Sequence, residues 1–108
     1  MELNTTARTN QFMLDVIDEI VRARTKHKGN AHQLAALSEE HGELAQAMLQ
    51  RDYEPDKKDD GDVYLEAVQT AAMAIRVATE GDSTFGYNPT NGAAIYAAKM
   101  KMREGAKE

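Results

Sequence analysis

Apolar residues recur three and four positions apart along most of this chain, the spacing that places them on one face of a helix. Segments with this spacing predict helices over residues 9–24, 31–51, 63–79 and 93–103. No segment alternates apolar and polar residues as a half-buried strand would. The pattern therefore predicts an all-α fold, a four-helix bundle. Because one predicted helix is apolar on almost every side, we expect the bundle to be completed by oligomerisation.

Polar breaks separate these segments. The first, KHKGN at residues 26–30, precedes a helix for which Asn30 is the candidate N-cap, with Gln33 at the capping-box position. The second, at residues 52–62, contains a proline, a glycine and many charged residues, and is expected to be a solvated loop that ends in an aspartate cap. The third, at residues 81–92, is rich in glycine and is expected to be another loop.

The helix predicted over residues 63–79 has only two charged residues, Glu66 and Arg76. A helix this apolar is buried on more than one side, and a carboxylate on it must be paired, protonated or bound to a metal ion. Gln69, three residues after Glu66, places a second oxygen ligand beside it. Arg76 is expected to form a structural ion pair rather than to bind a phosphate.

The preceding helix carries an acidic group, Glu39, Glu40 and Glu43, beside an apolar stripe. The stripe consists of Leu34, Leu37, His41, Leu44 and Met48. At about 100° per residue, Glu40 lies about 70° and Glu43 about 130° from its centre, whereas Glu39 is nearly opposite. Glu40 and Glu43 are therefore expected at the margin of the buried face, where they can still meet an ion. Its place in the stripe predicts that His41 is a hydrogen-bonded core residue.

Two helices joined by a short loop pack antiparallel, which would bring Glu40 and Glu43 opposite Glu66 and Gln69. Three carboxylates and an amide oxygen form a hard, all-oxygen site that prefers Mg²⁺, with Mn²⁺ as a substitute. The plain alternative is a solvated acidic face on a long helix. A di-iron bundle is disfavoured because the Glu-x-x-His pairs that it requires are missing.

These residues together resemble the motifs of the MazG-like branch of the all-α nucleoside triphosphate pyrophosphohydrolases. The motifs are E-E-x-x-E at Glu39, Glu40 and Glu43, and E-x-x-Q at Glu66 and Gln69. The context LSEEHGELAQAM extends the similarity beyond the acidic residues. The resemblance covers roughly residues 30–80, and it is the pair of motifs, rather than either one, that is specific.

The resemblance implies magnesium-dependent hydrolysis of a nucleoside triphosphate to the monophosphate and pyrophosphate, in a homodimer or a dimer of dimers. By motif position it implies that Glu40, Glu43 and Glu66 bind magnesium, and that Glu39 is a further ligand or positions the attacking water. The usual second motif is E-x-x-D, so Gln69 stands where an aspartate is expected. An amide oxygen still binds a hard cation, but it supplies neither a negative charge nor a base. The replacement of the usual aspartate by Gln69 leaves open how many magnesium ions the site would hold.

Four further residues are candidates for substrate binding: Lys57, Lys58, Asn88 and Asn91. The lysines lie in the loop between the motif helices and could meet the outer phosphates, although solubilising charge beside the loop aspartates is the simpler explanation. The asparagines could hydrogen-bond a nucleobase edge, but Asn-Pro-Thr-Asn-Gly is also an ordinary turn sequence.

The amino-acid composition limits the classes of binding partner that this chain is expected to have. Eighteen acidic residues against thirteen basic ones give a net charge of -5, which disfavours nucleic-acid binding. The chain has no cysteine, no signal-like start and no membrane-length apolar run, so we expect a single domain over residues 1–108 in the cytoplasm, without membrane contact. The rival hypothesis is a non-catalytic helical module that oligomerises and binds nucleotide or a protein partner without turnover, and Gln69 keeps it open.

Overall fold

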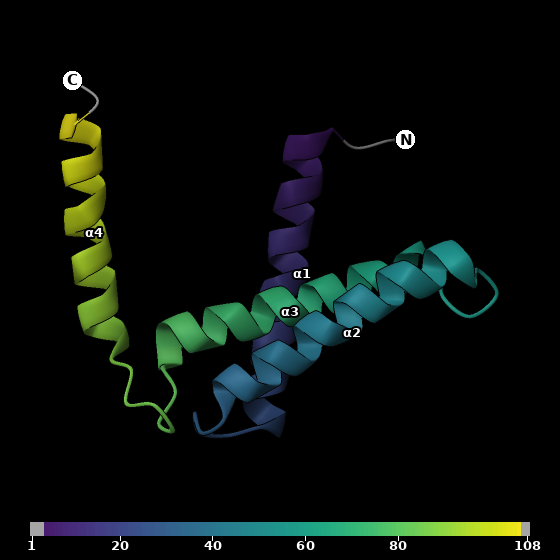
Figure 1. Cartoon of the computed structure of the whole chain (residues 1–108), viewed down its shortest axis with the longest axis horizontal. Coiled ribbons are helices and arrows are strands. Elements are labelled where there is room, and N and C mark those ends of the chain that lie inside the picture. The colour runs from purple at the N-terminus through teal and green to yellow at the C-terminus, as the bar shows by residue number, and fades with distance from the viewer. Residues whose placement is uncertain (1–3, 107–108) are drawn as a thin grey trace.

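The computed structural model describes residues 4–106, which form four helices and no strand. The helices are α1 (Thr5–Lys26), α2 (Gln33–Tyr53), α3 (Asp60–Glu80) and α4 (Pro89–Ala106) (Figure 1). The predicted all-α class is therefore confirmed over these residues. None of these helices is both long and apolar enough to cross a membrane.

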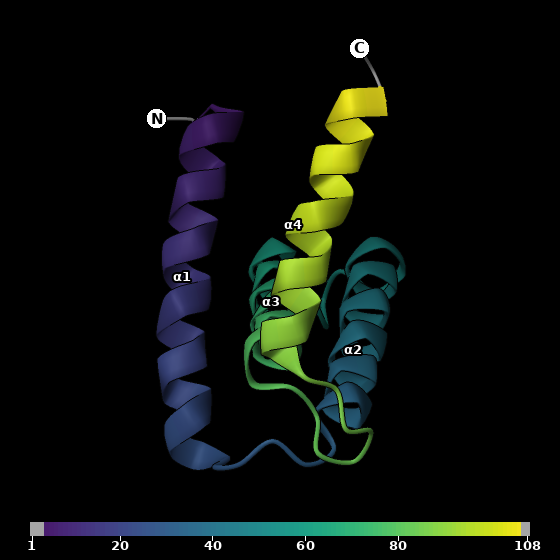
Figure 2. The same cartoon turned by 90° about the vertical axis from the view of Figure 1, so that its left-hand side faces the viewer.

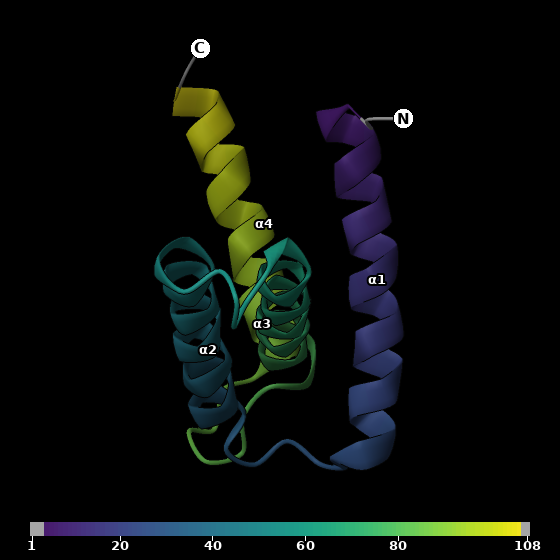
Figure 3. The ribbon, with the colours of Figure 1, turned by 90° about the vertical axis from the view of Figure 1, so that its right-hand side faces the viewer.

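The central helix is α3. Helix α2 runs beside it in the opposite direction, α1 crosses it on another face, and α4 contacts it near its C-terminal end (Figures 1 and 3). Neighbours on several sides are what a nearly uniform apolar helix requires. The prediction that this helix is buried on more than one side is confirmed.

The apolar core lies where α1 crosses α3. Its buried members are Val16 and Ile20 of α1 and Val68 and Ala72 of α3, with Phe12, Ala71 and Ile75 packed against them. The Phe12 ring meets the Tyr64 ring edge to face, with centroids 5.5 Å apart. Phe12, Val16 and Ile20 follow at intervals of four, so one face of α1 supplies its whole contribution.

The face of α2 that meets α3 differs from the predicted one. It is rotated by roughly 90° from the apolar stripe, so Ala47 is buried while Leu34 and Met48 remain about half exposed. His41 is exposed. The prediction that His41 is a core residue is wrong, because α2 turns its carboxylates and small residues toward α3 and leaves His41 on the exposed edge of the stripe.

The N-terminus of α2 is capped from a distant loop rather than by its own sequence. Asn30 is not the N-cap: His32 holds that position, with a φ of 60° and no side-chain cap bond. The Leu34 amide instead donates to the buried Asp82 carboxylate, at 2.8 Å. Asn30 donates to the Glu80 carbonyl, at 2.9 Å. The predicted cap is wrong because the acceptor comes from the loop after α3.

The other helices begin earlier than predicted, because capping residues rather than the first apolar residues set the start. Helix α1 begins at Thr5, behind the N-cap Asn4. Helix α3 begins behind Asp59, which forms a reciprocal capping box with Asp62. The cap is thus an aspartate as predicted, but it is Asp59 rather than Asp62, the last residue of the predicted loop. Helix α4 begins at Pro89, and proline is well suited to a first helical position.

Arg76 joins the C-terminal half of α3 to the loop between α1 and α2. Its side chain is 3% exposed and donates to the Glu80 carboxylate at 3.0 Å and to the carbonyls of His27 at 2.9 Å and Gly29 at 3.4 Å. Burial raises the pKa of Glu80, but hydrogen bonds from Arg76 and Arg24 outweigh it and hold that pKa below its usual value. The expected structural ion pair of Arg76 is confirmed.

The chain is open for its length. Helices α1 and α4 extend past the α2–α3 pair on the same side and stand apart there (Figure 2). Helix α4 has no buried residue. The radius of gyration is 16.8 Å, whereas a compact domain of this length has about 13 Å.

Asp82→Ala tests the long-range cap. Removing the carboxylate leaves the Leu34 amide without its acceptor, and we expect the free energy of unfolding to fall by about 2 kcal/mol. Urea unfolding at fixed protein concentration measures it. Asp56→Ala, a change of an exposed loop carboxylate, is the control and should stay within about 0.5 kcal/mol of the parent. Equal effects of the two changes would contradict a capping role.

Candidate metal centre

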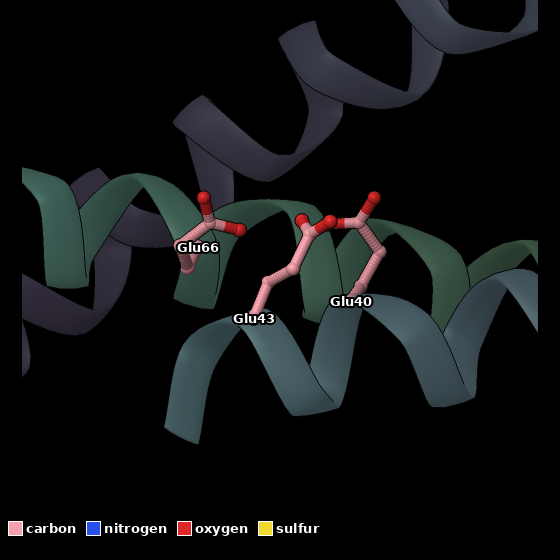
Figure 4. A group of neighbouring side chains, drawn as sticks. All are labelled: Glu40, Glu43 and Glu66. Atoms are coloured by element: carbon pink, nitrogen blue, oxygen red, sulfur yellow. The ribbon is translucent and has the colours of Figure 1, made fainter. Parts of the chain in front are cut away.

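The α2–α3 seam brings three carboxylates together. Glu40 and Glu43 come from α2 and Glu66 from α3, and each offers an oxygen within 4.8 Å of the other two (Figure 4). The Glu43 carboxylate lies between the other two (Figure 4). All three side chains are partly buried. The antiparallel packing expected from the sequence thus places these acids on facing helices.

Gln69 reaches the same group. With its amide nitrogen toward the acids, it donates to Glu40 Oε2 and Glu66 Oε2, each at 3.2 Å. With the amide turned over, its carbonyl oxygen occupies this position and faces the same two carboxylates, which suits a cation bound between them. An amide at this position can donate to the carboxylates or, turned over, offer its oxygen to a cation.

Thr70 sets the distance between the two helices at this level. Its hydroxyl is a donor to two carbonyls, that of Glu66 in its own helix at 2.7 Å and that of Glu40 across the seam at 3.1 Å, and its one proton is shared between them. The backbones that carry the carboxylates of Glu40 and Glu66 are thereby joined directly. This link lets α2 and α3 stay close despite the like charges between them.

The electrostatics of the group are unfavourable without a cation. Burial, followed by the charges of Glu43, Glu66 and Glu39, raises the pKa of Glu40 from 4.5 to about 7. Burial and Glu43 also raise the pKa of Glu66, although the Lys58 ammonium opposes this. Near neutral pH the group therefore holds a proton or needs a positive partner.

Hollows border the carboxylates on two sides. One, of about 450 Å³, is lined by the loop between α1 and α2, by the first turns of α2 and by Glu39, Glu40 and Met73. A second, of about 280 Å³, is lined by Glu43 and Glu66 together with Gln46, Gln50 and Lys58. A third, of about 90 Å³, lies between α1 and the seam and includes Gln69. The carboxylates are thus open to a ligand from either side.

The other predicted site residues are distributed unevenly. Glu39 is exposed and lies at the edge of the larger hollow, outside the three-carboxylate group. Lys58 borders the smaller hollow, whereas Lys57 forms an ion pair with Glu54 at 3.0 Å. Of the two lysines, only Lys58 is placed beside the carboxylates.

Asn88 and Asn91 lie at the start of α4. The Asn88 side chain accepts hydrogen bonds from the backbone amides of Thr90 and Asn91, which is a helix-capping arrangement. The neighbouring Tyr87 packs against Gly81, roughly 22 Å along α3 from Glu66. Within one chain these asparagines therefore do not border the carboxylates.

Sequence reasoning gave little weight to the loop between α1 and α2. His27, Lys28 and His32 line the larger hollow next to Glu40. The sequence feature that could have pointed to them is the short polar segment KHKGN with His32 just after it. The same feature is typical of an ordinary loop between two helices. Asp82 and its role in holding α2 left no local signal.

Comparison of the chain with protein-family models, with curated proteins and with solved structures finds no match. The chemistry of the site therefore rests on its own residues. Three carboxylates and an amide oxygen suit a hard divalent cation, and they leave coordination positions for water or for the oxygens of a ligand.

Glu40→Gln tests the electrostatic state of the group. Since its pKa is raised in the folded protein, the ionised Glu40 destabilises the fold above about pH 7, and this penalty disappears as the pH falls toward 4.5. In metal-free protein at about pH 8, the variant should melt about 4 °C higher than the parent, a shift worth about 1 kcal/mol. The difference should vanish near pH 5.

Magnesium should reverse the order of the two melting temperatures. An ion held by the carboxylates would stabilise the folded parent and raise its melting temperature, and it would stabilise Glu40→Gln much less. Calorimetry with and without Mg²⁺ measures both effects. Asp52→Asn, an exposed change on α2, should respond to magnesium like the parent. A parent that magnesium leaves unchanged would rule out a metal centre here.

Proposed function

We propose that this protein is a magnesium-dependent nucleoside triphosphate pyrophosphohydrolase of the MazG-like type, acting on a ribo- or deoxynucleoside triphosphate. The observation that carries the proposal is the convergence of Glu40, Glu43 and Glu66 from two antiparallel helices, with a hollow on either side. These are the acids that the resemblance assigns to magnesium. Pool control or clearance of nucleotides is the role that such a reaction would serve.

The donor set fits the reaction. Phosphoryl transfer depends mainly on positioning and on neutralising charge, and bound Mg²⁺ would supply the neutralisation and lower the pKa of a water ligand. Glu40, Glu43 and Glu66 would hold the metal, with the Gln69 carbonyl oxygen as a neutral ligand. Because the pKa of Glu40 is raised to about 7, binding of a cation near neutral pH would release a proton from the site.

Residues at the rim have distinct tasks in this proposal. Glu39 is exposed beside Glu40 at the edge of the larger hollow, where it can orient a water or accept its proton. Lys58 lies beside Glu66, where an ammonium would neutralise the leaving pyrophosphate. Gln69 cannot act as a base, so the proton must leave through a carboxylate or through solvent.

The open shape supports a homo-oligomer. The accessible surface of the chain is 8033 Å², about 2,100 Å² more than a compact monomer of 11.9 kDa exposes. Obligate dimers bury about 1,000 Å² or more per partner, so a second copy could cover the excess. The exposed apolar residues of α1 are Met13, Leu14, Ile17 and Val21. Helix α4, with no buried residue, also needs a neighbour to be stable.

Pyrophosphate release from the eight common ribo- and deoxynucleoside triphosphates tests the reaction. With Mg²⁺, we expect the monophosphate and pyrophosphate in equal amounts from one or a few of them. Glu40→Gln should lower kcat/KM on the order of 100-fold because a metal ligand is lost. Asp52→Asn should keep the rate of the parent.

The rival hypothesis has a different outcome. A folded protein that binds nucleoside triphosphates but turns none over, with either Mg²⁺ or Mn²⁺, would be a binding module. Gln69→Asp would then be the informative change, since it restores the missing acid of the motif. Activity gained in that variant would identify the parent as a decayed enzyme, and continued inactivity would reject the proposed reaction.

Ile17→Asp tests the oligomer. Ile17 is 51% exposed on α1, and a carboxylate there would be desolvated by a second copy. Sedimentation should give twice 11.9 kDa or more for the parent and the monomer mass for the variant. Gln11→Glu, which places a carboxylate on an exposed position of α1 about 120° around the helix from Ile17, is the control and should sediment as the parent does. A monomeric parent would contradict the proposal.

A further inference from the structure

We propose that the substrate lies across the carboxylates in one direction, with its nucleoside part in the larger hollow beside Glu40 and its pyrophosphate part in the smaller hollow beside Glu43 and Glu66. The inference rests on the proposed function and adds to it the side from which each end of the substrate is bound. It assigns nucleoside recognition to the α1–α2 loop and the first turns of α2.

The larger hollow has the size and lining of a nucleoside site. Its volume of about 450 Å³ lies within the range of about 300–1,000 Å³ typical of small-molecule pockets. Ala36 and Met73 supply an apolar wall. Most of the remaining lining is polar or charged: Gln33, His27, His32, Lys28, Arg76, Glu39 and Glu40. Imidazole rings stack on bases and hydrogen-bond to their edges.

The backbone at His32 supports a role for its side chain. His32 adopts a φ of 60°, the left-handed conformation that glycine adopts without strain. Its amide donates to the Thr84 hydroxyl at 3.0 Å, and the Ala36 amide donates to its carbonyl at 3.1 Å, so this conformation is held from both sides. A side chain kept at a strained position on the wall of a hollow is typical of a binding site.

The smaller hollow has a different character. Apart from Ala47, its lining consists of Gln46, Gln50, Lys58 and two of the carboxylates. Amide and ammonium donors bind phosphate oxygens, and the hollow offers no apolar wall for a base. Its volume of about 280 Å³ also makes it the smaller of the two.

The order of the carboxylates along the seam relates the two hollows to the direction of the substrate. Glu40 borders the larger hollow, Glu43 and Glu66 border the smaller one, and Glu43 lies between the other two (Figure 4). A phosphate held by the group therefore has the nucleoside on the Glu40 side and the leaving pyrophosphate on the Lys58 side. In the reverse direction the base would lose the apolar wall of Ala36 and Met73.

Two variants separate the ends of the substrate. Ala36→Trp fills the larger hollow, and its control, Ala35→Trp, places the same ring on the adjacent exposed position outside it. Lys58→Gln removes the ammonium of the smaller hollow. For each protein, calorimetry with Mg²⁺ measures binding of the four deoxynucleoside monophosphates and, separately, of inorganic pyrophosphate.

We expect each of the two variants to weaken binding of a different ligand. Ala36→Trp should weaken binding of the preferred monophosphate by about tenfold or more and leave pyrophosphate binding as in the parent. Lys58→Gln should do the opposite, and Ala35→Trp should change neither. The reverse pattern, or equal effects of Ala36→Trp and Ala35→Trp, would overturn the assignment.

A measurement on the unmodified protein tests the same inference without relying on a variant, which could fail to fold. In amide chemical-shift titrations with a monophosphate, the largest shifts should fall within residues 27–36 and at Met73. Shifts centred on residues 46–50 would overturn the inference. These experiments measure binding, so their outcome is independent of turnover. Pyrophosphate release together with the wrong binding pattern would refute only the proposed direction of the substrate. The expected binding pattern without any turnover would refute only the proposed reaction.

Discussion

Repulsion between three carboxylates is the constraint on which the rest of this structure depends. Glu40, Glu43 and Glu66 lie within 4.8 Å of one another in a partly buried seam, and like charges so placed oppose the packing of α2 on α3. The raised pKa of Glu40 and of Glu66 expresses the same cost. A chain that keeps such a group must hold its helices together by other means.

Contacts outside the group hold the helices in place. Thr70 joins the two backbones at the level of the carboxylates. At the loop end, Arg76 ties α3 to the carbonyls of the α1–α2 loop, and Asp82 caps α2 from the loop after α3. These buried polar contacts position the acids without pairing Arg76 with them, because Arg76 is already engaged by Glu80. The hollows beside Glu40 and Glu66 depend on the same framework.

The small core explains the open outline of the chain. Val16, Ile20, Val68 and Ala72 stabilise the crossing of α1 and α3, but several apolar residues of α1 remain exposed and no residue of α4 is fully buried. Devoting much of the α2–α3 seam to carboxylates and amides removes apolar area that a chain of this length would otherwise bury. The carboxylate group inside the seam and the apolar surface left exposed on α1 are thus two consequences of one arrangement.

Several features could be predicted from the sequence by itself. Helical periodicity determined the all-α class and the approximate helices, and the nearly uniform apolar pattern of residues 63–79 determined that α3 is central. The spacing of Glu40, Glu43 and Glu66 on two helices joined by a short loop was enough to predict that they meet. These features follow from local periodicity and chain connectivity, which the sequence contains.

Only the tertiary structure decided which face of α2 turns inward, and with it the exposure of His41 and the half-exposure of the apolar stripe. It also decided that Asp82, rather than Asn30, caps α2 and that the α1–α2 loop borders a hollow beside Glu40. The physical reason is that helix rotation is set by competition among all partners of a face. Caps and hollows formed by residues some fifty positions apart require the packed arrangement of α1, α2 and α3.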